Sequence, residues 1–181
     1  MPQPASLEEF AQSCVRFVEK AVGLTLDFTP ETLPVLDHYL RSARDLSAQR
    51  PESIPLLTAA AGAYIGELLR RRHPCTWNQD DDDPMGWFLE FDDHLMTVYP
   101  VAIAHVAIAG EDADAEFEVI QFKDDEREVV SAHLAELPAV SAEEYLAPST
   151  RVEVIDIAVD LLVAYRQKME EDPSPPDLEQ N

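Results

Sequence analysis

The fold of this 181-residue chain is decided by one apolar stretch, Ala59-Ala60-Ala61-Gly62-Ala63-Tyr64-Ile65-Gly66-Glu67. Gly62 and Gly66 stand four positions apart, so they share one face of a helix that we expect to start at a Ser53 cap and to run to about Arg72. Each glycine costs a helix about 1 kcal/mol relative to alanine, so a compensating contact is needed. We therefore predict a central helix whose glycine face is closely approached by another element.

Two helices are predicted before the central one. Ser6 and Glu9 suit a capping box, in which a hydroxyl and a carboxylate each accept a hydrogen bond from a free backbone N–H. Gly23 suits the left-handed position that closes a helix. The second helix begins at Thr29-Pro30-Glu31 and frays from about Ser47. Apolar residues at helical spacing predict one buried face on each helix.

A small antiparallel sheet is predicted after Pro74. Segments rich in aromatic and β-branched residues predict strands at 75–77, 87–91 and 95–99. An acidic loop, 79–86, joins the first two strands, and the polar turn 92–94 joins the last two. The short turn favours a hairpin.

The segment after the sheet leaves two alternatives open. Residues 101–109 fit a helix opened by Pro100 and closed by Gly110, and the alternative is a strand through 101–103. Residues 116–122 fit a strand, or part of a helix that starts at Ala113.

Helices are predicted for the remainder of the folded chain. One covers 123–137, a short one follows a second capping box at Ser141, and a long one begins at Ser149 or Thr150. Because helices come first and last with strands between them, we expect a single α+β domain: N-terminal helices, a small central antiparallel sheet and C-terminal helices. Its expected extent is residues 1–169, with a disordered acidic tail at 170–181.

The net charge limits what the protein can bind. The chain has 36 acidic and 13 basic residues, a formal charge of −23. Such a surface repels nucleic acid and anionic lipid and favours a basic protein partner. The tail carries only five of the acids, so most of the excess belongs to the folded part. No apolar run reaches 18 residues, so we expect no membrane span.

Two observations bear on the compartment. Cys14 and Cys75 lie far apart, fit no metal-ligand spacing and are expected to be reduced thiols. The first residues show no signal peptide, so we expect a cytoplasmic protein. Scarce lysine beside plentiful arginine, alanine and proline suggests a bacterial source.

Acidic and aromatic residues gather around the predicted hairpin, and we take them as the candidate partner-binding surface. They are Asp80, Asp81, Asp82, Asp83, Trp87, Phe88, Glu90, Asp92 and Asp93. Alternation sends Trp87, Leu89 and Phe91 to one face of the sheet and Phe88 and Glu90 to the other. The alternative for the aromatic residues is packing in the core.

Sites for catalysis or metals find weaker support. The acidic loop fails as an EF-hand, because Asp83 occupies the glycine position and Leu89 the glutamate position. The group His73, Cys75, Asp92, Asp93 and His94 has no zinc-site spacing, and three of its members would converge only if the hairpin placed the Cys75 strand beside the 92–94 turn. No nucleophile elbow and no phosphate-binding glycine loop is present. We predict that the protein has no cofactor, and we favour a protein that is not an enzyme.

The sequence leaves two interpretations of Glu67 open. Beside a close-packed backbone, its carboxyl group can be buried with a raised pKa and act as an acid or base. It can equally pair with Arg70 or Arg71 on its own helix.

The run from Ala60 to Arg70, then Trp77, then Thr97-Val98-Tyr99-Pro100, resembles a pattern in uncharacterised bacterial domains. Those domains have a Gly-x-x-x-Gly-Glu helix, a tryptophan-bearing strand, a hairpin and a strand that runs into proline. The resemblance covers residues 50–110 and implies no activity. Some similar small acidic proteins look like accessory or immunity factors beside bacterial toxins. The long acidic loop departs from the pattern.

Three functions remain. The favoured one is a non-enzymatic protein of immunity, inhibitor or adaptor type that binds a basic partner. The second is an enzyme that uses Glu67 or the His73–His94 region, with or without a metal. The third is a structural or oligomeric component.

Overall fold

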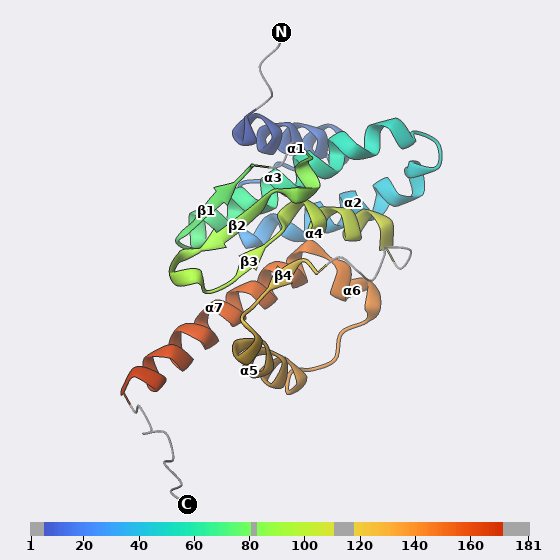
Figure 1. Ribbon diagram of the computed structural model, residues 1–181. Helices are drawn as coiled ribbons and strands as arrows, with labels where there is room; N and C mark the ends of the chain where they lie inside the picture. The colour runs from blue at the N-terminus through green and yellow to red at the C-terminus, as the bar shows by residue number, and fades with distance from the viewer. Residues whose placement is uncertain (1–5, 81–82, 111–117, 172–181) are drawn as a thin grey trace, which may run out of the picture.

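The computed structural model describes residues 6–80, 83–110 and 118–171. Its helices are α1 (Leu7–Val22), α2 (Leu33–Ser47), α3 (Ile54–Arg72), α4 (Pro100–Ala109), α5 (Asp124–Ala135), α6 (Ala142–Leu146) and α7 (Pro148–Glu171). Its strands are β1 (Cys75–Asn78), β2 (Phe88–Phe91), β3 (Thr97–Val98) and β4 (Ile120–Gln121). Short 3₁₀ turns are η1 (Pro30–Thr32), η2 (Pro51–Ser53), η3 (Pro84–Gly86) and η4 (Asp92–His94). The α+β prediction is confirmed: N-terminal and C-terminal helices flank a small antiparallel sheet (Figure 1).

The sheet has the order β1-β2-β3-β4, with every neighbouring pair antiparallel. Cys75 faces Phe91 across the predicted hairpin, and Leu89 faces Val98. The expected alternation holds along β2, where Leu89 and Phe91 are buried and Glu90 is exposed. The segment 116–122 contributes strand β4, and residues 111–117 lie outside the described part of the chain.

Helix α3 forms the centre of the core, between α1 and α4, and all its residues from Leu57 to Leu69 are buried. A Cβ atom on Gly62 would lie 2.4 Å from the Cα atom of Val101 in α4. A Cβ atom on Gly66 would lie 2.0 Å from the Trp77 ring of β1. The predicted close approach is therefore confirmed. Gly62 leaves room for the backbone of α4, and Gly66 leaves room for the Trp77 indole ring.

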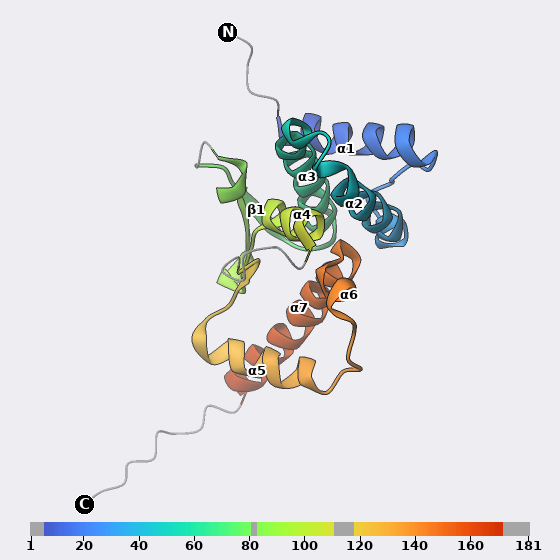
Figure 2. The ribbon, with the colours of Figure 1, turned by 90° about the vertical axis from the view of Figure 1, so that its right-hand side faces the viewer.

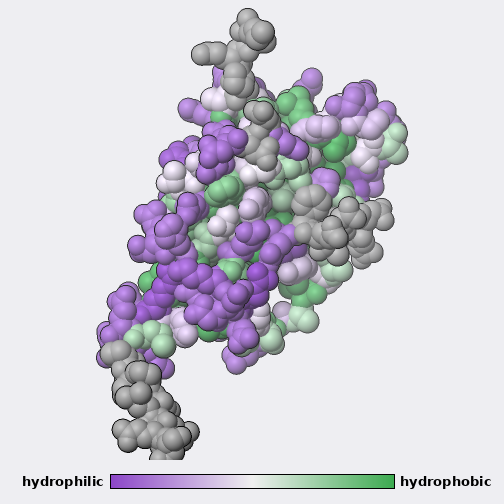
Figure 3. Space-filling view, viewed as in Figure 1, coloured by the Kyte–Doolittle hydropathy of each residue, from purple (hydrophilic) through white to green (hydrophobic). Residues whose placement is uncertain are grey.

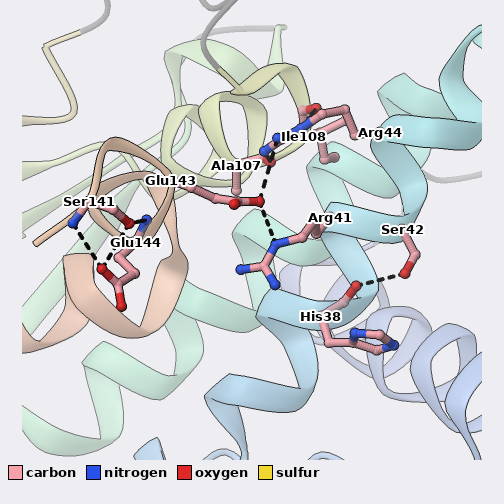
Figure 4. A network of polar contacts seen from close by, with 9 residues as sticks. All are labelled: His38, Arg41, Ser42, Arg44, Ala107, Ile108, Ser141, Glu143 and Glu144. Carbon is pink, nitrogen blue, oxygen red and sulfur yellow. Dashed lines mark hydrogen bonds and ion pairs between the residues drawn. The ribbon is translucent and has the colours of Figure 1, made fainter.

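Segment 100–109 forms helix α4 and not the alternative strand, and all of its residues except the partly exposed His105 and Ala109 are buried. Arg44 of α2 caps its C-terminal end. The Arg44 Nε atom donates to the Ile108 carbonyl at 3.1 Å and Nη2 donates to the Ala107 carbonyl at 2.9 Å (Figure 4). Gly110 closes the helix with φ +68°, and a Cβ atom there would lie 2.6 Å from the Arg44 guanidinium carbon.

The predicted ends of the helices were mostly correct. Ser6 and Ser141 form both capping boxes, and Gly23 closes α1 in the left-handed conformation. The Ser53 cap was wrong: its backbone is already helical and its side chain caps nothing, because η2 runs directly into α3. Helix α7 begins at Pro148, where the Asp37 carboxylate of α2 accepts hydrogen bonds from the Ser149 N–H at 3.0 Å and from its hydroxyl at 2.5 Å.

Helices α5 and α6 pack on α7, on the side of the molecule away from α1 (Figure 2). Helix α7 continues to Glu171, two residues into the expected tail, and 172–181 lie outside the described residues. Among the helices that the structure describes, none has the length and apolar character needed to cross a bilayer.

Candidate functional site

The residues predicted to bind a partner lie around both ends of strand β2. Asp83 and Trp87 flank η3 before the strand, and Asp92 and Asp93 form η4 after it. Strand β2 spans about 10 Å, at about 3.4 Å per residue. The structure therefore divides the predicted surface into two groups on either side of the strand. The loop group is Asp80, Asp83 and Trp87, and the turn group is Asp92 and Asp93. Residues 81–82 lie outside the described part of the chain.

The loop group has hydrogen bonds within the loop itself. The Asp83 carboxylate accepts from the Met85 N–H at 3.0 Å and so caps η3. The Asn78 side-chain oxygen accepts from the Asp80 N–H at 3.1 Å. These bonds shape the loop while Asp80 and Asp83 stay exposed.

The two aromatic residues of the predicted surface contact other rings. Trp87 meets Phe10 of α1 edge to face, with ring centroids 6.0 Å apart. Phe88 lies 5.6 Å from Tyr99 at a tilted angle. Because both side chains are half-buried, they attach the hairpin to the core and leave part of their surface to solvent.

The turn group has an unusual backbone. Asp93 and His94 have φ of 57° and 52°, the left-handed region, which costs a non-glycine residue about 1–2 kcal/mol. Surrounding hydrogen bonds hold the turn in place. The Asp92 N–H donates to the Pro74 carbonyl at 3.0 Å, and Arg166 of α7 donates to the carbonyls of Asp93 at 2.8 Å and His94 at 3.3 Å.

Arg166 is itself fixed by a buried carboxylate. Its Nε and Nη2 atoms donate to the two oxygens of Glu126 in α5, at 2.5 and 2.9 Å. The Glu126 side chain is only 5% exposed, and its hydrogen bonds raise the pKa of Arg166 further. One guanidinium therefore joins α5, α7 and η4.

A hollow of about 270 Å³ lies over this turn, lined by Thr76, Glu90, Phe91, Asp92, Asp93 and His94. Glu90 pairs with His94, whose Nδ1 atom lies 2.5 Å from a carboxylate oxygen. The Asp92 and Asp93 carboxylates make no hydrogen bond or ion pair with any described residue. The hollow is thus lined by two carboxylates that accept no hydrogen bond from a described residue, on a turn held by Arg166, whose charge also acts on Asp93.

The acidic excess lies on the surface of the described chain. Glu67 and Glu126 are its only buried acidic residues, and each is paired with an arginine. Hydrophilic residues cover the part of the molecule where η4, α5 and α7 meet (Figure 3). Among the described residues, the acidic side chains other than Glu67 and Glu126 therefore lie at least partly at the surface.

Glu67 does not have the raised pKa that acid–base catalysis requires. Burial pushes its pKa upward, but hydrogen bonds from Arg70 and Trp77 outweigh burial and bring the pKa below its ordinary value. Arg70 donates at 2.8 and 3.0 Å, and the Trp77 indole N–H donates at 3.0 Å. The salt-bridge interpretation is confirmed, and Glu67 is held as an ion.

The two histidines considered as part of a metal group, His73 and His94, have different partners. The His73 Nε2 atom lies 2.6 Å from Asp156 of α7, and His94 pairs with Glu90. Burial raises the pKa of the Cys75 thiol to about 11, so it stays protonated. Within the described ranges, no three histidine, cysteine or acidic side chains are placed to hold a metal ion.

Arg166 and Glu126 were not anticipated from the sequence. They stand 40 positions apart, so no local spacing joins them. The sequence held one signal for the burial of Glu126. It lies one turn before Val130 on a predicted helix, so the two side chains share a face, and both are buried.

No protein-family model, no curated protein and no solved structure matches this chain.

Proposed function

We propose that this protein is a non-enzymatic binding protein, which engages a basic protein partner through the acidic surface around η4. The observation that carries the proposal is the hollow in which the exposed Asp92 and Asp93 carboxylates accept no hydrogen bond from a described residue, while Arg166 holds the turn beneath them. A lysine or arginine side chain entering the hollow would find acceptors already in place, so binding would need little ordering of the site.

Charge supports the same conclusion. A net charge of −23 attracts a basic partner from a distance, and a local cluster of carboxylates then determines where the partner binds. The exposed Asp80 and Asp83 of the loop, with Asp81 and Asp82 beside them in sequence, would extend the surface.

An immunity, inhibitor or adaptor protein of the bacterial cytoplasm fits these features. Both cysteines are free and buried, which agrees with a reducing compartment but does not define it.

The test is an NMR titration of the ¹⁵N-labelled chain with a hexa-arginine peptide at 150 mM salt. We expect chemical-shift changes concentrated at Thr76 and at 90–94. The double variant Asp92→Asn/Asp93→Asn should weaken binding about tenfold, because charged hydrogen bonds of about 1.5 kcal/mol are lost. The control Asp45→Asn/Glu52→Asn removes the same charge from exposed residues outside the hollow.

Equal weakening by the two double variants would show that the peptide responds only to net charge, and the proposal would fail. If the site is confirmed, capture from a bacterial lysate with wild-type and Asp92→Lys/Asp93→Lys baits identifies the partner as the protein that only the wild-type retains.

A further inference from the structure

A second hollow, far from the acidic surface in the fold, has the opposite character. It measures about 600 Å³ and lies between the end of α1, the middle of α2 and the start of α3. This volume falls within the about 300–1,000 Å³ typical of small-molecule sites. Its walls come from three separate helices, so its shape is set by their packing and not by one loop.

The floor of this three-helix groove is apolar. Ala43 and Leu57 are buried core residues, and the half-buried Val22 and Ile54 continue the same surface outward. An apolar ligand body placed here would leave water and contact aliphatic side chains on several sides. The groove therefore favours a hydrocarbon or aromatic group.

The charges around the groove are unlike those of the rest of the protein. None of the described residues that line it is an aspartate or a glutamate, although the chain has 36 of them. Its ionisable lining residues include Arg50 and His38. The Arg50 guanidinium forms no hydrogen bond or ion pair with any described residue. A free cation therefore stands at the edge of an apolar hollow.

Two hydroxyl groups add to this arrangement. Tyr39 and Ser53 line the groove, and neither side chain has a hydrogen-bond partner within the described ranges. Burial raises the pKa of Tyr39, so its hydroxyl remains protonated and able to donate. Arg50, Tyr39 and Ser53 are thus three lining residues whose side-chain donors are not used by any described residue.

We infer that this groove binds a small amphipathic monoanion, with an apolar body against Leu57 and Ile54 and a carboxylate head against Arg50. The single unpaired guanidinium matches a single negative charge. A ligand with several charges would be repelled by the net charge of −23.

The experiment measures the binding of octanoate, hexanoate and 1-octanol by calorimetry, with the methyl signals of Val22, Ile54 and Leu57 followed by NMR. Burial of each methylene favours binding about fourfold, so octanoate should bind about 15-fold more tightly than hexanoate. Arg50→Gln should weaken octanoate about tenfold and leave octanol unchanged. The matched control is Arg16→Gln, an exposed arginine of α1 that does not line the groove.

Three results would overturn the inference. They are a failure of octanoate to shift those methyl signals, a loss of octanoate binding in Arg50→Gln no larger than in Arg16→Gln, and binding of octanol as tight as that of octanoate. The last result would indicate a site for neutral apolar molecules. Because Arg50 is exposed and forms no side-chain bond within the described chain, its replacement should leave the fold intact, which circular dichroism verifies.

Discussion

Arg166 and Glu126 form a two-bonded ion pair between α7 and α5, and the same guanidinium also donates to the carbonyls of η4. The pair stands where the C-terminal helices meet the sheet. It therefore connects the stability of the fold to the geometry of the acidic surface.

Replacing Arg166 by methionine should destabilise the protein by about 3–5 kcal/mol, because a buried carboxylate loses its partner. Urea unfolding measures the change. Arg127→Met is the control, because its ion pair with Glu118 is about half exposed and should contribute less than about 1 kcal/mol. The double variant Arg166→Met/Glu126→Leu should recover most of the loss. An Arg166→Met effect no larger than that of Arg127→Met would contradict the assigned role.

Gly62→Ala should destabilise the protein by about 1–3 kcal/mol, despite the gain of about 1 kcal/mol in helix propensity. The new Cβ atom would lie 2.4 Å from the backbone of Val101, so α3 and α4 must separate. Thermal unfolding tests this. Gln12→Ala, at an exposed position of α1, should be neutral or slightly stabilising. A more stable Gly62→Ala protein would show that the two helices are not in such close contact.

Arg44→Met should destabilise by about 2 kcal/mol, since charged hydrogen bonds to the Ala107 and Ile108 carbonyls are lost. Hydrogen exchange should quicken at the C-terminal end of α4. Arg41→Met is the matched change on the same helix. Its ion pair with Glu143 is about half exposed on both sides, so the loss should stay under about 1 kcal/mol (Figure 4). Similar losses for both variants would contradict the capping role of Arg44.

Glu67→Gln should reveal a pH-dependent contribution to stability. Although burial alone would raise it, the pKa of Glu67 in the folded protein lies below its ordinary value of 4.5, because Arg70 and Trp77 donate to the ionised form. The stabilisation is therefore full above the unfolded pKa and is lost as the pH falls through the folded pKa. Urea unfolding between pH 7 and pH 3 should show the wild-type advantage over Glu67→Gln shrinking only at the acidic end.

The exposed Glu52→Gln serves as the reference for that series. If the wild-type advantage grew on acidification, Glu67 would have a raised pKa in the folded protein, and the acid–base alternative would regain support.

Local chemistry determined much of this fold. The capping boxes at Ser6 and Ser141, the closing Gly23 and the alternation along β2 are short-range effects, and each appears where the residues predict it. The close approach at Gly62 was also foreseeable, because a glycine in a helix interior demands a compensating contact. The choice between helix and strand at 101–103 could not be foreseen, since a short buried apolar run suits either element.

By itself, the sequence determined the helices before and after the sheet, the hairpin, the acidic excess and the presence of a tightly packed central helix, because these depend on composition and on spacings within a few residues. Only the tertiary structure decided that Arg166 joins Glu126 to η4, that Arg44 caps α4, and that a carboxylate-free groove forms beside Arg50. Each of these brings together residues from separate elements. Their contacts arise from how whole helices pack, which no local spacing records.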